Sequence, residues 1–357
     1  MLKIYDKIIL WFWAKGFTLL ISVLISFKAR SRMSHNNGIA GKGWLRIVDA
    51  PQFPEHEFFE AKRIYPIRLR HATVSYLDDA MRAVRSCSIK FSHDKFKSPF
   101  DLQFNSGQKP LFWSAVSFIR FGTMKKAKYG LNYVEWNKHY PDGWEGANDA
   151  LRRNPTSFHN IHYYTKTPFN FVGKDGIQRY AKYRILPNDD SLESGKEDLI
   201  PDPYNQRILP DEKRGRNYLK YEYEELVKKG KVGYKIQIQL HEASDDMDHE
   251  VFNSMVVWNE EINPWMDLAT FEIESCYDWE ESLLTTFSLR NMPKSLGIIK
   301  ATSIYDYNSL NYMRYHSELA HKTRLLSYKI FGMPPMIPDD DNRNTEAWDK
   351  GTYSKHN

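Results

Sequence analysis

The stretch YKIQIQLH at residues 234–241 decides the fold class of this chain. Its isoleucine and leucine residues alternate with lysine and glutamine, which is the period of a β-strand with one buried face and one solvated face. The segment DLATFEIE at residues 267–274 predicts a second strand and follows a turn-like Asn-Pro pair. Two such strands can pair side by side, so we expect an antiparallel sheet.

Helical periodicity outside these strands makes the expected class α+β. Residues 217–229 (NYLKYEYEELVKK) and 306–330 repeat apolar side chains near helical spacing and therefore predict helices. Runs of aromatic and β-branched residues within 44–120 and 158–186, separated by Pro, Gly and Asp, predict further strands and turns. The chain has 357 residues, of which 41% are hydrophobic and 15% aromatic, so it can form a sizeable buried core.

The two ends of the chain differ from the rest. Residues 8–27 form an apolar run, interrupted by Lys15 and Gly16, that is long enough to span a bilayer. No small-residue cleavage site follows it, so an anchor or interfacial helix is favoured over a signal peptide, with a helix packed on the domain or on a partner chain as the alternative. Residues 334–357 are acidic and nearly devoid of aliphatic side chains. We therefore expect an N-terminal arm or membrane anchor over 1–31, one domain over 32–333, and a flexible acidic tail over 334–357.

Charge and cysteine content argue against several function classes. The 50 basic and 45 acidic residues are interspersed and leave a net charge of +5, so no basic stripe points to nucleic acid. Cys87 and Cys276 lie far apart and form no CxxC pair, which argues against a disulfide framework and a zinc site. His159 and His162 have no third candidate ligand nearby in the sequence and are expected to be structural.

Five stretches carry a family pattern. They are RMSHNNGIAGKGWLRIV from Arg32, YPIRLRHATVSYLDDAMRAVRSCSIKF at 65–91, FDLQFNSGQKPLFW at 100–113, NPTSFHNIHYYTKTPFNF from Asn154, and VVWNEEINPWMDLATFEI at 256–273. In this order they resemble the catalase-like superfamily of haem proteins, particularly its small branch of allene oxide synthase domains and uncharacterised bacterial proteins. The match extends over about residues 32–320.

The resemblance implies a fold and most of a site. The fold would be a catalase-like antiparallel β-barrel with surrounding helices and a proximal helix that carries the haem ligand, and the cofactor of the domain at 32–333 would be haem b. His35 matches the distal histidine and would move a proton between the two oxygens of a hydroperoxide. Asn105 matches the distal asparagine that orients the substrate oxygen. Arg32 and Arg70 match residues that bind the haem propionates.

The axial ligand of the iron stays open between several residues. In this family a tyrosinate in the pattern R-x-x-x-Y holds the iron, and the arginine keeps the phenolate ionised. Arg314 is followed at that spacing by Glu318 rather than by tyrosine. Arg324 and Tyr328 have the required spacing but lie ten residues later.

Tyr315 and His321 are rivals of Tyr328 as the ligand. Each lies one helical turn from Glu318, so either could approach an iron centred there. A site without haem, or one in which Glu318 faces the iron, also remains open.

The residues and the resemblance together predict a haem-dependent enzyme of the peroxidase or catalase kind. Its substrate would be an organic hydroperoxide, including fatty-acid hydroperoxides, or hydrogen peroxide. Ser34 before His35 favours the organic class, because the allene oxide synthase branch has a hydroxyl residue there. The alternative is a catalase fold without haem catalysis that serves as a lipid-associated or structural module. Membrane lipid contacted by residues 8–27 is the other expected partner, a second copy of the chain stays open, and the location would be cytoplasmic or membrane-associated.

Overall fold

The computed structural model describes most of the domain and part of each end. The described residues are 4–17, 20, 32, 35, 37–74, 78–123, 126–127, 130–131, 142–197, 208–246, 250–316 and 323–333. The predictions made for Ser34, Glu318, His321 and the tail at 334–357 fall outside these ranges.

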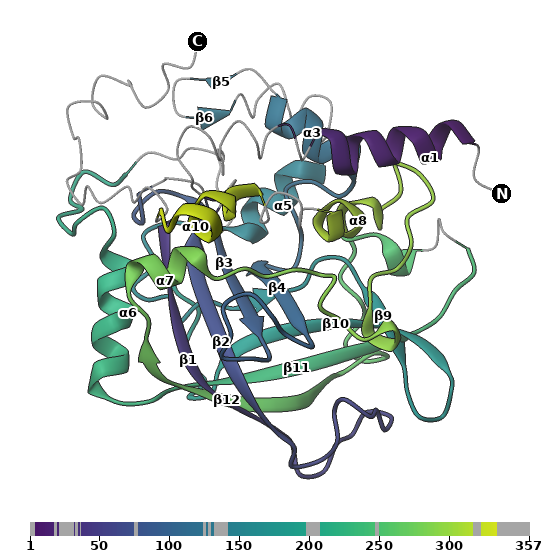
Figure 1. The fold of residues 1–357 in the computed structure, drawn as a ribbon, viewed down its shortest axis with the longest axis horizontal. Helices are drawn as coiled ribbons and strands as arrows, with labels where there is room; N and C mark the ends of the chain where they lie inside the picture. Colours follow the sequence, from purple (N-terminus) through teal and green to yellow (C-terminus); the bar gives the residue numbers. More distant parts are fainter. Residues whose placement is uncertain are drawn as a thin grey trace.

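A closed antiparallel β-barrel forms the centre of the molecule (Figure 1). Eight of the described strands join in the order β11-β12-β1-β2-β3-β4-β8-β10, and β10 pairs with β11 to complete the circle. Their bounds are β1 Asn37–Ile47, β2 Ile64–Thr73, β3 Ala83–Lys90, β4 Asp101–Ser106, β8 Tyr163–Tyr164, β10 Gln178–Pro187, β11 Val232–Glu242 and β12 Trp265–Cys276. Closure gives each of these strands a neighbour on both sides.

Strands β11 and β12 are the two that the sequence predicts most clearly, and they pair antiparallel as expected. Buried and half-buried positions alternate along β11 from residue 232 to 238, so Ile236 and Ile238 are fully buried. The core that the strands enclose is apolar and aromatic, and includes Ile67, Leu69, Cys87, Ile89, Leu102, Phe104, Tyr163, Tyr183, Tyr234 and Phe271. Cys87 is buried in this core, whereas Cys276 is half-buried at the end of β12.

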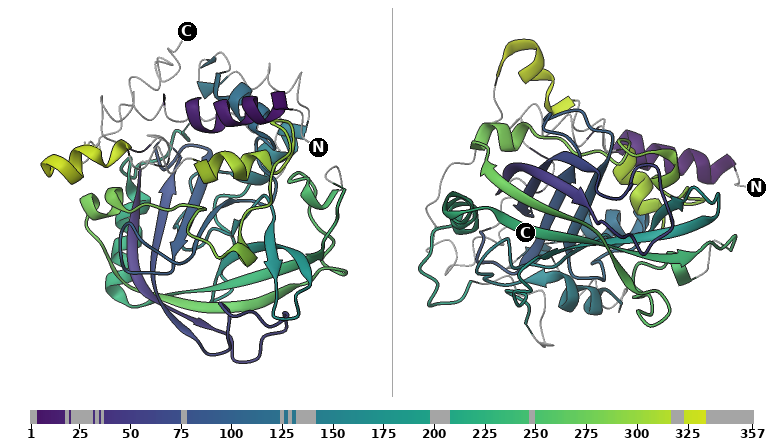
Figure 2. Two further views of the ribbon diagram at one scale, coloured as in Figure 1. Left: turned by 45° about the vertical axis from the view of Figure 1, so that its right-hand side comes forward. Right: turned by 90° about the horizontal axis from the view of Figure 1, so that it is seen from below.

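Helices cover one end and one side of the barrel (Figures 1 and 2). Helix α6, Tyr218–Lys229, packs against β1 and β12 and confirms the helix predicted over 217–229. The helices across the upper end in Figure 1 are α1 Ile4–Trp11, α3 Ala115–Thr123, α5 Asp142–Ala150, α7 Trp279–Leu284, α8 Ser309–His316 and α10 Leu326–Phe331. Smaller elements are a π-helix at Phe12–Phe17, 3₁₀ turns at Glu250–Phe252 and Lys294–Leu296, and strands β5 Lys126–Ala127, β6 Gly130–Leu131, β7 Leu151–Arg152 and β9 Phe169–Val172.

The helix predicted over 306–330 differs from the structure. The described part consists of α8, Ser309–His316, and of residues 323–331, in which a turn at Leu325 precedes α10. Leu325 in this turn is buried, so the spacing of apolar residues continues through it. Hydrophobic spacing alone therefore does not show where the helix is interrupted.

In the described N-terminal segment, α1 and the π-helix cover residues 4–17. None of the described helices has the length and hydropathy needed to cross a bilayer.

Candidate functional site

Three buried arginines converge on the C-terminal end of α7. They come from separate parts of the chain: the segment before β1, strand β2, and the segment before α10. The hydrogen bonds run from Arg32 Nη1 to Thr285 O at 2.6 Å, from Arg70 Nε to Ser282 O at 3.0 Å, and from Arg324 Nη1 to Leu283 O at 2.8 Å. The last carbonyl oxygens of a helix lack partners within the helix, so they are natural acceptors for these guanidinium groups.

The arginine cluster concentrates positive charge in a buried place. Burial and the neighbouring charges of Arg32 and Arg324 hold the pKa of Arg70 well below its usual range. Burial and Arg32 do the same to the pKa of Arg324. Among the described residues, Nε and Nη2 of Arg324 are buried and have no hydrogen-bond partner. An anionic ligand would relieve both the repulsion and these unsatisfied donors.

His35 lies beside this cluster in a constrained backbone conformation. Its φ is +58°, in the left-handed region that residues other than glycine seldom adopt, and its carbonyl oxygen accepts a 2.9 Å hydrogen bond from Arg70 Nη1. Burial, together with the charges of Arg70, Arg32 and Arg314, lowers the pKa of His35 to about 3. The imidazole is therefore neutral at physiological pH.

Asn105 lies on the same outer face of the barrel as Arg70. In the strand register Gly38 pairs with Ala72, Ala72 with Ser86, and Ser86 with Asn105. Directly paired residues share a face of a sheet, so this row crosses four strands. Asn105 therefore lies two strand spacings, roughly 10 Å, from the strand that carries Arg70.

Small side chains keep this face flat between the arginine cluster and Asn105. Gly38 is required at its position, because a Cβ there would meet the His71 carbonyl oxygen at 2.1 Å and the Ala72 Cβ at 2.6 Å. Ala72 and Ser86 continue the row without a long side chain.

Lys166 stabilises the turn that follows Asn105, and no sequence motif indicates this role. Its Nζ donates to the carbonyl oxygens of Ser106 at 2.7 Å and Lys109 at 3.2 Å, and also to that of Gly107. Burial lowers the pKa of this amine to about 7, with Asp149 acting in the opposite direction. One buried side chain thus bonds three carbonyl oxygens of the turn after β4.

On α8, Arg314 is the residue that approaches His35. Its charge is among those that lower the pKa of His35, and its Nη1 donates to Asn311 Oδ1 at 3.4 Å. Tyr315 is directed elsewhere, because the Arg290 guanidinium lies 4.5 Å from the centre of its ring. The structure therefore brings Arg314 to the cluster but not Tyr315.

The side chains of Arg324 and Tyr328 also lie in different surroundings. Arg324 is buried among the arginines, whereas Tyr328 is half-buried on α10, with Lys95 Nζ 5.4 Å from the centre of its ring. The turn at Leu325 lies between them, so they do not share one continuous helical face. Arg32, His35, Arg70, Arg314 and Arg324 thus gather, while none of the described contacts brings Tyr328 to them.

The short helix α7 is the other part of the site that the sequence analysis missed. Asp278 caps its first turn by accepting a 2.7 Å hydrogen bond from the backbone N–H of Glu281. The pattern Asp-x-x-Glu at 278–281 is a capping box and could have predicted this helix. The carbonyl oxygens that receive the arginines belong to its last turn and the residues just after it.

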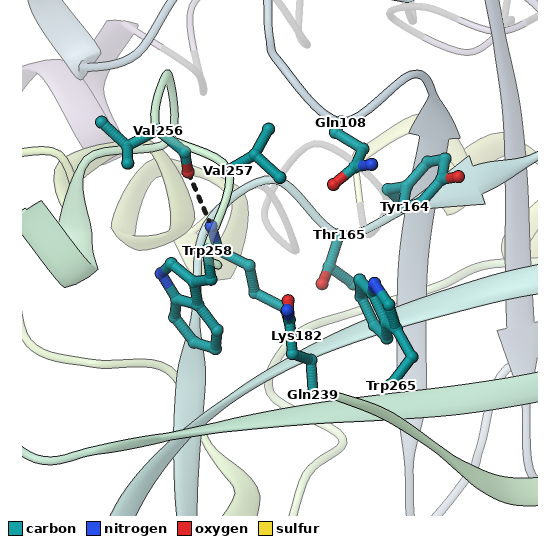
Figure 3. A pocket seen from close by; sticks show the side chains of 9 residues that line it. All are labelled: Gln108, Tyr164, Thr165, Lys182, Gln239, Val256, Val257, Trp258 and Trp265. Atoms are coloured by element: carbon teal, nitrogen blue, oxygen red, sulfur yellow. Dashed lines mark hydrogen bonds between the residues drawn. The ribbon is translucent and has the colours of Figure 1, made fainter. Parts of the chain in front are cut away.

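A separate pocket opens between β10, β11 and the segment at 256–258 (Figure 3). Lys182 is buried in it, with its Nζ 3.2 Å from the Val256 carbonyl oxygen and 4.4 Å from the centre of the Trp258 ring. Burial lowers the pKa of this amine to about 7. The lining residues are Gln108, Tyr164, Thr165, Lys182, Gln239, Val256, Val257, Trp258 and Trp265, and none belongs to the arginine cluster.

Two curated proteins resemble the chain over most of its length. The identity to the Allene oxide synthase-lipoxygenase protein of Plexaura homomalla is 37% over 304 residues, or 84% of this chain and 28% of that protein. The identity to Linolenate 9R-lipoxygenase of Nostoc sp. is 26% over 296 residues, or 79% of this chain and 37% of that protein. The chain therefore spans only about a third of the length of these relatives. No family model matches it.

A solved structure gives the same assignment of the fold. A fungal catalase matches with a TM-score of 0.65, covering 84% of this chain and 60% of that chain at 15% sequence identity. Identity at this level shows the fold alone. The closed antiparallel barrel, this structural match and the similarity to the coral protein agree with one another, and the chain belongs to the catalase-like superfamily.

Proposed function

We propose that this protein binds haem and acts on organic hydroperoxides. The observation that carries the proposal is the convergence of Arg32, Arg70 and Arg324 beside a neutral His35. Haem b has two carboxylates, and buried guanidinium groups are well suited to bind them. When bound, the haem would supply the iron at which an O–O bond can break.

The protein's own residues support distinct roles around that group. Arg32, Arg70 and Arg324 would hold the carboxylates. His35, neutral because of its buried and positive surroundings, would accept the hydroperoxide proton and return it to the departing oxygen. Asn105, held by the turn that Lys166 fixes, would donate a hydrogen bond that orients the substrate.

The residue that would hold the iron is proposed from the position of Arg314. This arginine lies in the last turn of α8 and matches the arginine that precedes the ligand in the family pattern, so we favour a ligand in the segment that follows it. In the sequence Glu318 and His321 follow Arg314 by four and seven residues. His321 is then a stronger candidate than Tyr315 or Tyr328, whose described contacts are with Arg290 and Lys95.

The substrate class is proposed from the relatives. The name of one relative contains allene oxide synthase and lipoxygenase, and the name of the other contains linolenate, a fatty acid. Fatty-acid hydroperoxides are therefore the first substrates to test, ahead of hydrogen peroxide.

Lipid association without haem chemistry is the second candidate, and one observation favours it. Helix α1 and the start of the π-helix expose a row of large apolar side chains, whose exposed fractions range from 54% to 77%: Ile4, Tyr5, Ile8, Trp11 and Phe12. An amphipathic segment of this kind can lie in a membrane interface.

An absorption spectrum tests the proposal. The full chain would be expressed with a haem precursor and compared with Arg324→Gln, His321→Ala, Tyr315→Phe and Tyr328→Phe. We expect a ferric Soret band in the parent, weaker haem retention in Arg324→Gln, and a band shift in one ligand variant. A folded parent protein with no Soret band would refute haem binding and leave lipid association as the function to pursue.

A further inference from the structure

Two tyrosines and a histidine form a row inside the barrel, on the other side of the sheet from the arginine cluster. Tyr223 comes from α6, Tyr234 from β11 and His71 from β2. The hydroxyl oxygens of Tyr223 and Tyr234 are 3.0 Å apart, and the Tyr234 hydroxyl lies 2.9 Å from His71 Nε2. The exposed fractions of the three residues are 1%, 0% and 0%. No residue of the proposed haem site belongs to this row.

Aromatic packing holds the row rigid. The His71 ring is stacked on Phe158, with centroids 5.3 Å apart and an interplanar angle of 7°. The Tyr234 ring is stacked on Phe271 at 4.8 Å and 16°. Neither ring can turn without disturbing a close-packed core, so the oxygen-to-nitrogen distance is fixed.

The hydrogen bonds of the row leave one buried polar group without a partner. His71 Nδ1 is buried, and within the described residues it has no hydrogen-bond partner. If Tyr223 donates to Tyr234 and Tyr234 donates to His71, the unpaired Nδ1 carries the hydrogen. If the row runs the other way, the hydroxyl hydrogen of Tyr223 has no acceptor among the described contacts. A buried donor is therefore left unsatisfied in both arrangements, which destabilises the folded protein.

Burial keeps all three groups neutral in the resting protein. It raises the pKa of both tyrosines well above 10 and lowers the pKa of His71 well below its ordinary value. The phenolic proton therefore stays on oxygen until an electron is removed. An oxidised phenol is a far stronger acid than the resting phenol, so an adjacent imidazole then becomes the acceptor.

We propose that Tyr234 is a redox-active tyrosine, with His71 as its proton acceptor. One electron leaves Tyr234, its O–H bond breaks, and an N–H bond forms at His71 Nε2. The products are a neutral phenoxyl radical, an imidazolium and an oxidant reduced by one electron. Tyr223 donates a hydrogen bond to the phenoxyl oxygen and stabilises it. The return of one electron and the proton restores the resting pair.

The row lies close to the proposed haem site. His71 directly follows Arg70 on β2, and successive side chains of a strand point to opposite faces, with Cα atoms about 3.8 Å apart. Only the natural oxidant rests on the proposed function: it would be a one-electron oxidant derived from the hydroperoxide substrate. Tyr234 would supply one electron to that oxidant.

A photochemical experiment on the haem-free full chain tests this directly. A ruthenium tris-bipyridine complex, photo-oxidised by a sacrificial acceptor, supplies the one-electron oxidant, and electron paramagnetic resonance with transient absorption detects phenoxyl radicals. The variants are Tyr234→Phe, Tyr223→Phe and His71→Phe. Tyr183→Phe is the matched control, because Tyr183 is equally buried in the same barrel and its hydroxyl has no hydrogen-bond partner among the described residues.

We expect a long-lived phenoxyl signal that Tyr234→Phe abolishes, that His71→Phe lowers at least tenfold, and that Tyr183→Phe leaves unchanged. Formation of the radical in the parent protein should slow in deuterium oxide, because a proton moves with the electron. This measurement needs no variant, so it stands if His71→Phe fails to fold. An unchanged signal in Tyr234→Phe, or no isotope effect in the parent, would overturn the proposal. Since haem is absent, the result is independent of whether a Soret band is found.

Discussion

Arg70 donates a 2.9 Å hydrogen bond to the carbonyl oxygen of His35 while its Nε donates to Ser282 at 3.0 Å. One guanidinium thus holds the histidine backbone and the end of α7 at the same time. Lysine has a single terminal nitrogen and cannot reproduce this fork. We expect Arg70→Lys to weaken binding of added hemin at least tenfold, measured by a Soret titration.

A control for Arg70→Lys is Arg46→Lys. Arg46 is a surface residue of β1 whose ion pair with Asp49 leaves its side chain 56% exposed. Its substitution should leave the hemin affinity unchanged. Equal affinities of the Arg70 variant and the parent protein would contradict the proposed role of Arg70.

Acid should destabilise the haem-free protein through its buried histidines. The folded pKa of His35 is about 3 and that of His316 about 4, while the unfolded value of each is near 6.5. Between these values the unfolded chain binds more protons than the folded chain, so stability falls as the pH decreases from about 6.5. The slope is at most about 1.4 kcal/mol per pH unit for each such histidine.

Urea unfolding from pH 7.5 to pH 4.5 measures this slope. His35→Gln removes one of the titrating groups, so its free energy of unfolding should depend less steeply on pH than that of the parent. Identical slopes for the parent and His35→Gln would show that His35 is not held neutral.

Lys90 and Asp101 form a fully buried ion pair with a 3.2 Å separation between Nζ and Oδ2. The carboxylate also accepts from the Ser288 N–H and from Asn291 Nδ2, so Lys90→Met would leave it buried with only neutral donors. We expect this substitution to lower the free energy of unfolding by about 3–5 kcal/mol. Urea denaturation measures it, and Lys228→Met, in an exposed pair, should cost less than about 1 kcal/mol. A small loss in the Lys90 variant would mean that the buried carboxylate is solvated or protonated.

Lys166→Met tests how the turn after Asn105 affects the chemistry. Without the amine the carbonyl oxygens of Ser106 and Lys109 lose their donor, and Asn105 should become less well oriented. We expect an unchanged Soret band with a roughly tenfold slower turnover of a fatty-acid hydroperoxide. Lys174→Met, at a surface lysine with a 51% exposed side chain, is the control. Parent-like turnover in Lys166→Met would argue that Asn105 needs no such support.

The exposed side chains of α1 make a prediction about lipid. Ile8 and Trp11 are 59% and 54% exposed, and replacing both with glutamate should abolish co-sedimentation with vesicles of phosphatidylcholine and phosphatidylserine. Ile177→Glu places a charge at an equally exposed apolar residue, 54% exposed, beside β10 and should have no effect. If the double variant binds vesicles as well as the parent protein does, α1 does not contact lipid.

The barrel could be predicted in part because its signal is local. Alternation of period two along β11 follows from a strand with one face in the core, and it holds whatever the neighbouring strands are. The closure of the barrel is not local, because it needs β1 to pair with β12 from the other end of the domain.

The candidate site could be predicted less completely. Arg32 and Arg70 are recognisable by resemblance, but Arg32 meets Thr285 across 253 residues of sequence, and no spacing rule reports such a contact. Arg324 and Tyr328 show the opposite failure. Their spacing suggests that both lie on one face of a helix. Because of the turn at Leu325, however, Arg324 lies in the arginine cluster and Tyr328 lies near Lys95.

Strand β1 is bordered by β2 and β12, and this has a consequence during synthesis. The residues of β2 leave the ribosome soon after those of β1. The β12 partners of β1 are made much later: Gly41 pairs with Cys276, and Ile47 pairs with Ala269. Until then one side of a mostly buried strand exposes unpaired backbone groups to other chains. Folding of this barrel therefore ends with a long-range pairing step, and the nascent chain should depend on chaperones most strongly in the interval between the emergence of β1 and that of β12.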